Sequence, residues 1–239
     1  MPDRGRRDRA SGRRFAIYFA PPAGSRLAEA GARWLGRDAQ SRRPLAQPRL
    51  AGLSAERLAA ITAAPRRYGF HATLKAPFSL AGDRTVAELH ESAARLAAGR
   101  DAFSMSLRVG QISGFLALVP ARTPEALAGL EAACVRELDP FRAPENEVDA
   151  QRRRAAELSA RQESLLRLWG YPYVLEEFRF HMTLTERLEE PERGRIEALL
   201  KEMFGPALDA PVRIDAISVF EQPDRGSPFS ETARHALRG

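Results

Sequence analysis

Alternating apolar and polar positions divide much of this chain into strand-like segments. Residues 14–20 (RFAIYFA) alternate in this way and are rich in β-branched and aromatic side chains, so they predict a strand that ends at Pro21-Pro22. A hairpin is expected around Ser113-Gly114, between apolar segments 103–112 and 115–119. The same criteria predict further strands over residues 68–78, 176–185, 212–220 and 229–237.

Helix-like patterns lie between these strands, and a segment carrying Pro44 and Pro48 reads as a loop. Ser25 and Thr123 are the expected caps of two of the helices. The predicted helices cover residues 25–35, 54–63, 85–98, 124–138, 148–169 and 191–204. Strands that alternate with helices in a similar order in both halves indicate a duplicated α+β unit. We expect one domain of two pseudo-symmetric lobes over residues 14–239, preceded by a disordered arginine-rich tail over residues 1–13.

One short sequence occurs twice, near the middle of each half. Residues 70–74 read FHATL and residues 180–184 read FHMTL, so each copy is a His-x-Thr between apolar residues. The two histidines are 181 − 71 = 110 residues apart, and they are half of the four histidines in the chain. A single His-x-Thr is usually a structural pair, but two copies in the same frame on strand-like segments favour a shared site.

Strand periodicity sorts the residues of each motif onto two faces, because side chains two apart share a face about 7 Å apart. The first strand then carries His71, Thr73 and Lys75 on a polar face, and the second carries Arg179, His181, Thr183 and Thr185. The opposite faces are apolar, with Phe70 and Leu74 on one strand and Phe180 and Leu184 on the other. If the two polar faces look at each other, they form a cleft with two imidazoles, hydroxyls and two cations.

These groups are suited to metal-free hydrolysis of a phosphate ester. Imidazole titrates near neutral pH, so one histidine can remove a proton from water while the other protonates the leaving oxygen. The residues leave open which of His71 and His181 takes which role. Hydroxyls of Thr73 and Thr183 can donate to the nonbridging oxygens, and Lys75 and Arg179 can hold a second phosphate.

Two tyrosines are further candidates for contact with the substrate. Tyr18 shares a face of its strand with Arg14 and Ala16 and could line the cleft, although a surface position is the slightly favoured interpretation. Tyr68 directly precedes the first motif strand, from where it could reach the ligand.

The composition narrows the class of protein. The chain has 239 residues and a formal net charge of +6, carried almost entirely by arginine, which binds phosphate through a planar fork. Its single cysteine, Cys134, excludes an internal disulfide and is typical of a reducing cytosol, so we expect a cytoplasmic protein. No apolar run reaches the length of a membrane span, no secretion signal is recognised, and no metal-ligand spacing accompanies the histidines.

The strings YGFHATLKAPF (residues 68–78) and FRFHMTLTERL (residues 178–188) resemble the 2H phosphoesterase superfamily. With RFAIYFAP near the start, they look like the branch associated with phosphonate metabolism (DUF1045-like). The resemblance implies a bilobal α+β fold in which two antiparallel sheets face each other across a central cleft, with helices outside. It also implies His71 and His181 as the catalytic pair, Thr73 and Thr183 as phosphate-holding hydroxyls, and no cofactor. The branch suggests a ribosyl cyclic phosphate as substrate, for example 5-phosphoribosyl 1,2-cyclic phosphate.

Two other functions fit the same residues. One is RNA-end processing of the 2′,5′ RNA ligase-like type, which ranks lower because RNA binding favours exposed aromatic side chains and only 8% of the residues are aromatic. The other is a noncatalytic module that binds a phosphorylated ligand. The sequence does not determine the oligomeric state.

Overall fold

The computed structural model describes residues 12–144 and 157–239, and the predicted disordered tail over residues 1–13 lies almost wholly outside them. The first part of the expected helix 148–169 also lies outside, and its second part is helix α8 (Ala160–Trp169). Seven strands form one antiparallel sheet in the order β11-β10-β1-β4-β8-β7-β6. They are β1 (Arg14–Phe19), β4 (Ala72–Phe78), β6 (Leu107–Ile112), β7 (Phe115–Pro120), β8 (Met182–Arg187), β10 (Ala216–Gln222) and β11 (Ser230–Ala236).

The sheet consists of two parts joined at a single paired position. Strands β4 and β8 pair only at Ala72 and Met182, whereas every other neighbouring pair in the sheet shares several positions. The expected α+β class with two antiparallel sheets is therefore confirmed, with the addition that the two sheets are continuous. The motif strands lie side by side at this junction, so their polar faces are adjacent rather than opposed.

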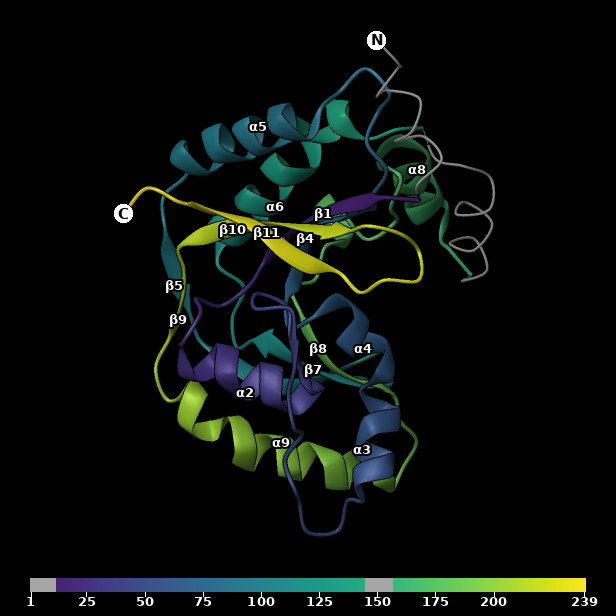
Figure 1. The fold of residues 1–239 in the computed structure, drawn as a ribbon, viewed down its shortest axis with the longest axis vertical. Coiled ribbons are helices and arrows are strands. Elements are labelled where there is room, and N and C mark those ends of the chain that lie inside the picture. Colours follow the sequence, from purple (N-terminus) through teal and green to yellow (C-terminus); the bar gives the residue numbers. More distant parts are fainter. Residues whose placement is uncertain (1–11, 145–156) are drawn as a thin grey trace.

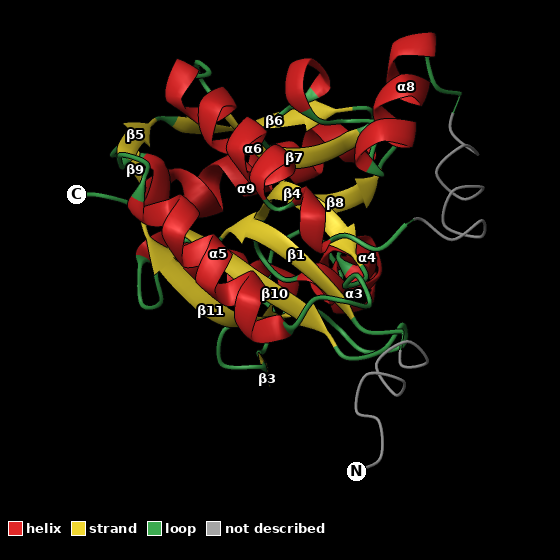
Figure 2. Ribbon diagram, turned by 90° about the horizontal axis from the view of Figure 1, so that it is seen from above, coloured by secondary structure: helices red, strands yellow, loops and turns green. Residues whose placement is uncertain are grey.

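Each part of the sheet has its own helices (Figure 1). Helices α5 (Val86–Ala98) and α6 (Glu125–Glu137) contact the β11-β10-β1-β4 part, with α5 lying over β10 and β11 (Figure 2). The β8-β7-β6 part is covered by α2 (Arg26–Leu35), α3 (Ala55–Ile61), α4 (Ala63–Tyr68) and α9 (Glu192–Leu208). Each lobe thus draws elements from both halves of the sequence. The remaining strands form two small ladders, β2 (Arg37–Asp38) with β3 (Arg43–Pro44), and β5 (Phe103–Met105) with β9 (Val212–Ile214).

Local sequence signals explain several of the element boundaries. The Ser25 side chain accepts the amide N–H of Ala28 and caps α2, as expected. Ser113 and Gly114 adopt φ angles of 46° and 89°, which suit a two-residue hairpin loop between β6 and β7. The expected Thr123 cap is wrong, because the N-cap position of α6 falls on a proline and no side chain makes a cap hydrogen bond there.

Both motif strands begin later than the alternation predicts. Residues 63–68 form helix α4, and Gly69 then ends it at φ +79°, a left-handed conformation that glycine adopts without strain. Residues 175–177 form a 3₁₀ turn before the second motif. Each motif histidine therefore stands directly before its strand rather than inside it.

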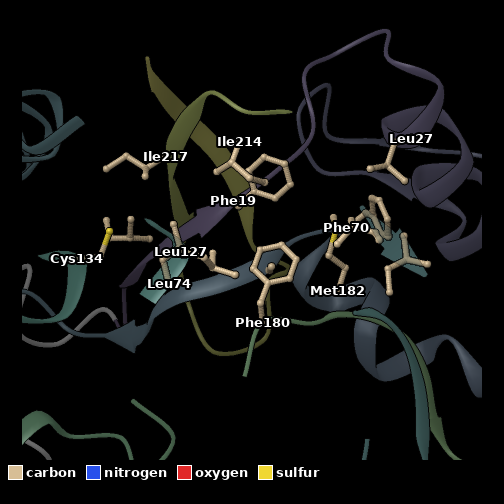
Figure 3. Close-up of a cluster of buried hydrophobic side chains, with 14 of the residues drawn as sticks. Phe19, Leu27, Phe70, Leu74, Leu127, Cys134, Phe180, Met182, Ile214 and Ile217 are labelled. Atoms are coloured by element: carbon tan, nitrogen blue, oxygen red, sulfur yellow. The ribbon is translucent and has the colours of Figure 1, made fainter. Parts of the chain in front are cut away.

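The apolar residues around the motifs fix both strands on one core. Phe70, Leu74, Phe180 and Met182 are at most 6% exposed. They belong to the main hydrophobic cluster, part of which is drawn in Figure 3. Helix α2 approaches this cluster so closely that a Cβ on Gly31 would lie 2.1 Å from the Phe70 ring. Burial of this size is the main favourable term in folding, so the motif backbones are rigidly held.

Candidate active site

The pairing of β4 with β8 brings the two His-x-Thr motifs together. Ala72 pairs with Met182 in an antiparallel bridge, and both side chains are fully buried. His71 and Thr73 flank Ala72, and His181 and Thr183 flank Met182, so the two motifs lie side by side at the junction of the lobes. All four flanking side chains are partly exposed, and the two histidines are close enough for a charge on His181 to lower the pKa of His71.

Both imidazoles are held by the same local hydrogen bond. Nδ1 of His71 lies 2.9 Å from the carbonyl oxygen of Gly69, and Nδ1 of His181 lies 2.7 Å from that of Arg179. A carbonyl oxygen only accepts, so each Nδ1 carries a proton, and Nε2 holds the lone pair when the ring is neutral. Nε2 of His71 lies 3.3 Å from the hydroxyl of Thr73. The residue two positions before each histidine thus sets its tautomer.

Aromatic rings pack against both histidines. The Tyr18 ring stacks on His71, with ring centroids 3.8 Å apart and an interplanar angle of 27°. Tyr18 is 1% exposed, so the surface alternative for this tyrosine is wrong. Tyr68 stacks on Phe229, and its ring centroid lies 6.2 Å from that of His71. Both tyrosines named from the sequence therefore border the first motif.

Burial lowers the pKa of both histidines. For His71 the pKa falls to about 4, chiefly because the ring is desolvated, and a charge on the neighbouring His181 would lower it further. The pKa of His181 is also lowered by desolvation, against the opposing effect of the Arg179 carbonyl. The free site therefore favours two neutral rings, and an anionic ligand would raise both pKa values.

A cavity of about 480 Å³ opens beside the motifs, and Thr73 and His181 both line it. Two guanidinium groups, those of Arg179 and Arg187, border the same cavity, and neither has an ion-pair partner among the described residues. The cavity is of ordinary size for a small-molecule site. The remaining lining residues are mainly aromatic and acidic: Phe115, Tyr171, Tyr173, Phe178, Glu131, Glu157 and Glu177.

Lys75 does not share the polar face, contrary to the sequence prediction. Tyr18 pairs with Thr73 while Ile17 pairs with Lys75, so Leu74 is an extra residue that forms a β-bulge. The bulge shifts the alternation, and the Lys75 amine donates instead to the Val135 carbonyl oxygen at 2.9 Å.

The Lys75 amine also bonds Asp139 at 3.1 Å, and the residue is 4% exposed and does not border the cavity. Thr185, also placed on the polar face by the alternation, is buried, and its hydroxyl bonds backbone groups of Glu186 and Leu116.

Sequence reasoning missed Arg187 and Glu131. Arg187 lies an even number of positions after His181, so a longer predicted strand would have included it on the polar face. Glu131 gives no local signal, because it stands on helix α6 and only the tertiary fold brings it to the cavity.

Within residues 12–144 and 157–239, no three His, Cys, Asp or Glu side chains gather as a metal site requires. In the same residues, no helix combines the length and apolar character needed to cross a bilayer.

Comparison with known proteins places this chain in a family. Residues 73–230 match the model of the family described as "Protein of unknown function (DUF1045)", so the chain belongs to the DUF1045 family, as its motifs predicted. It is 39% identical over 231 residues to the "Ribose 1,5-bisphosphate phosphokinase PhnN" of Janthinobacterium sp. (strain Marseille), covering 95% of this chain and 51% of that protein. A protein of the same name from Laribacter hongkongensis (strain HLHK9) is 40% identical over 216 residues, covering 90% of this chain and 50% of that protein. The chain therefore spans about half the length of the curated relatives it matches.

Solved structures with a similar arrangement are more distant. The apo form of E. coli LigT is 15% identical, with a TM-score of 0.45 over 96% of this chain and 100% of that one. A structure described as a phosphoesterase is 17% identical, with a TM-score of 0.41 over 95% of this chain and 99% of that one. These similarities are too low to carry ligands or activities over to this chain.

Proposed function

We propose that this protein is a phosphoesterase that hydrolyses a cyclic phosphodiester of a small phosphorylated sugar or nucleotide, using two histidines and no metal. The observation that supports it most directly is the pairing of Ala72 with Met182, which brings the two His-x-Thr motifs side by side at the junction of the lobes. A phosphorus atom bound at this junction would have an imidazole Nε2 and a threonine hydroxyl from each strand within reach. Such a pair of nitrogens suits in-line displacement, in which the attacking and leaving oxygens lie on opposite sides of phosphorus.

The proposed reaction divides the proton transfers between the rings. His71, whose pKa is lowered to about 4, is neutral and takes a proton from water as the new P–O bond forms. One ring P–O bond breaks, and protonated His181 gives its proton to the leaving oxygen. Bound phosphate keeps His181 charged because an adjacent anion raises the pKa of an imidazole. The hydroxyls of Thr73 and Thr183 donate to the nonbridging oxygens, where charge accumulates.

The name of the curated relatives supports a particular substrate. Opening 5-phosphoribosyl 1,2-cyclic phosphate at its bond to O2 would give ribose 1,5-bisphosphate, the compound in that name. The two lysines of this chain each follow a leucine, so it contains no G-K-[ST] phosphate-binding loop. We therefore propose that the kinase activity of the name belongs to the part of those relatives outside the match, and that this chain supplies its substrate.

Arg179 and Arg187 are the groups we propose for the second phosphate of this substrate. Both border the cavity that Thr73 and His181 line, whereas the amine of Lys75 is engaged by Asp139. The aromatic side chains around the cavity also suit a nucleobase, and they favour a nucleotide or RNA end as the second candidate substrate.

Turnover of purified protein on 5-phosphoribosyl 1,2-cyclic phosphate, followed by ³¹P NMR, tests the proposal. We expect ribose 1,5-bisphosphate as product, unchanged rates in EDTA, and a loss of at least about 100-fold in kcat for His71→Ala and for His181→Ala. His90→Ala is the matched control, because His90 lies on α5 near His235 and outside the cavity. Turnover at the wild-type rate in both motif variants would refute the mechanism, and turnover only of 2′,3′-cyclic nucleotide ends would favour the RNA alternative. Binding of the cyclic phosphate without turnover would identify a noncatalytic module.

A further inference from the structure

Glu131 is a buried carboxylate on helix α6 whose position the proposed reaction does not explain. It is 1% exposed, yet it borders the cavity that also holds Thr73 and His181. A buried carboxylate is costly unless hydrogen bonds or an opposite charge compensate its desolvation. Its surroundings therefore indicate which chemical group of a ligand binds in this part of the cavity.

The protein's own hydrogen-bond donors and charges compensate only part of the desolvation of the Glu131 carboxylate. Both oxygens of Glu131 lie 3.2 Å from one donor, the backbone N–H of Leu175, which they share. An ionised carboxylate has about four acceptor positions. The nearest lysine, Lys75, is committed to Val135 and Asp139, and no ion pair of Glu131 occurs in the described parts of the chain. Desolvation accordingly raises the pKa of Glu131 to about 7.

The charge of the cavity argues against a purely anionic ligand. Three carboxylates border it, those of Glu131, Glu157 and Glu177, against two guanidinium groups. Glu177 is already bonded by Gln162 Nε2 at 3.0 Å, which leaves Glu131 as the buried acceptor in need of a donor. Beside the Glu131 carboxylate, away from the two arginines, a phosphate would be repelled because it is anionic and offers mainly acceptors, whereas an alcohol offers a proton.

We propose that Glu131 accepts a hydrogen bond from a free sugar hydroxyl, so that the site selects a cyclic phosphate carried on a sugar with an unmodified neighbouring hydroxyl. This inference rests on the proposed function and names the substrate class of that same site. In the ribosyl substrate suggested above, O1 and O2 are part of the cyclic phosphate and O5 carries the second phosphate. The free hydroxyl that donates to Glu131 is therefore the 3-hydroxyl. Glu131 is then a specificity-determining residue rather than one that touches the reacting atoms.

The competing explanation is that Glu131 only anchors Leu175. Leu175 has a φ of +56°, which is strained for a leucine, and the carboxylate holds its N–H. The variant Glu131→Gln separates the two roles, because one amide oxygen still accepts that N–H while the carboxylate charge is lost. Glu177→Gln is the matched control at a cavity carboxylate that already has a donor.

The experiment measures kcat/KM at pH 8 for 5-phosphoribosyl 1,2-cyclic phosphate, for its 3-deoxy analogue, and for catechol cyclic phosphate, which has no hydroxyl. The wild type should prefer the ribosyl compound over the 3-deoxy analogue by about 10- to 100-fold, as expected for a hydrogen bond to a charged group. In Glu131→Gln this ratio should shrink by about tenfold, with catechol cyclic phosphate hydrolysed at the wild-type rate. Glu177→Gln should keep the wild-type ratio.

Each other outcome overturns the inference in a distinguishable way. If Glu131→Gln lowers all three rates equally, or leaves the 3-deoxy ratio unchanged, Glu131 is an anchor and the proposed hydrolysis still stands. If the wild type hydrolyses none of the three compounds, or does so independently of His71 and His181, the proposed function itself fails and the inference falls with it.

Discussion

Replacing Lys75 by methionine should destabilise the protein without affecting its catalysis, although Lys75 belongs to the string that carries the first motif. The substitution removes the amine that donates to the Val135 carbonyl at 2.9 Å and to Asp139 at 3.1 Å. Methionine fills a similar volume, so the cavity term is small. The Val135 carbonyl loses its side-chain donor in a site that is 96% shielded at Lys75, which costs about 1–3 kcal/mol.

Asp139, the second partner of the Lys75 amine, limits the loss of stability. Asp139 keeps its two bonds to the Arg142 guanidinium, at 2.8 Å and 3.1 Å, so its charge does not become unpaired. We therefore expect a total of about 2–3 kcal/mol, below the 3–5 kcal/mol typical of a broken buried ion pair. For a chain of this size, that corresponds to a fall in Tm of roughly 4–12 °C.

Urea unfolding and steady-state kinetics at 25 °C check both halves of this prediction. The midpoint should fall with an unchanged m-value, and kcat/KM of the folded variant should stay within about threefold of the wild type. Arg187→Met is the opposite case, with stability preserved and KM raised. A folded Lys75→Met protein that has lost more than about tenfold in kcat/KM would show that the amine reaches the substrate and that the bulge argument is wrong.

Three further predictions concern the pH dependence of the reaction, two glycines and one buried tryptophan. Desolvation lowers the pKa of both motif histidines, to about 4 for His71, so the pH optimum of kcat/KM should lie below 6.5. The optimum of kcat should lie at a higher pH, because bound phosphate raises the pKa of both histidines. An optimum of kcat/KM above pH 7 would contradict this prediction. Gly31→Ala should destabilise strongly, since its Cβ would lie 2.1 Å from the Phe70 ring, whereas Gly129→Ala meets no atom within 4 Å and should be neutral or slightly stabilising by thermal unfolding. Trp34→Phe should cost about 1–3 kcal/mol in chemical denaturation, because it leaves a buried carbonyl of β8 without the indole donor that lies 2.7 Å away.

Much of the secondary structure could be predicted because its causes are local. Ser25 caps α2, Thr85 forms a capping box at the start of α5, and Ser113-Gly114 turns a hairpin through positive φ angles. Each of these signals operates within about four residues, so no tertiary information is needed to interpret it. The expected cap at Thr123 fails for an equally local reason, since the proline that follows occupies the cap position.

The lobes could not be derived in the same way. The sequence places one motif in each half, which suggests one lobe per half, but β4 joins the sheet formed by both ends of the chain. Strand pairing between distant segments depends on how whole apolar faces are buried together, and no local pattern records it. The pseudo-symmetry of the lobes stays a prediction.

For the candidate site, the four motif side chains could be named as candidates from the sequence, although each histidine stands directly before its strand. His71 and His181 alternate with apolar neighbours, and that period of two requires one face to be buried and the other polar. The other groups at the site depend on contacts between distant segments: a bulge in β4 turns Lys75 away, and helix α6 brings Glu131 to the cavity. The difference lies in the sequence separation of the interacting residues. Alternation is a property of one strand, whereas bulges, strand register and helix packing are set by contacts between segments far apart in the chain.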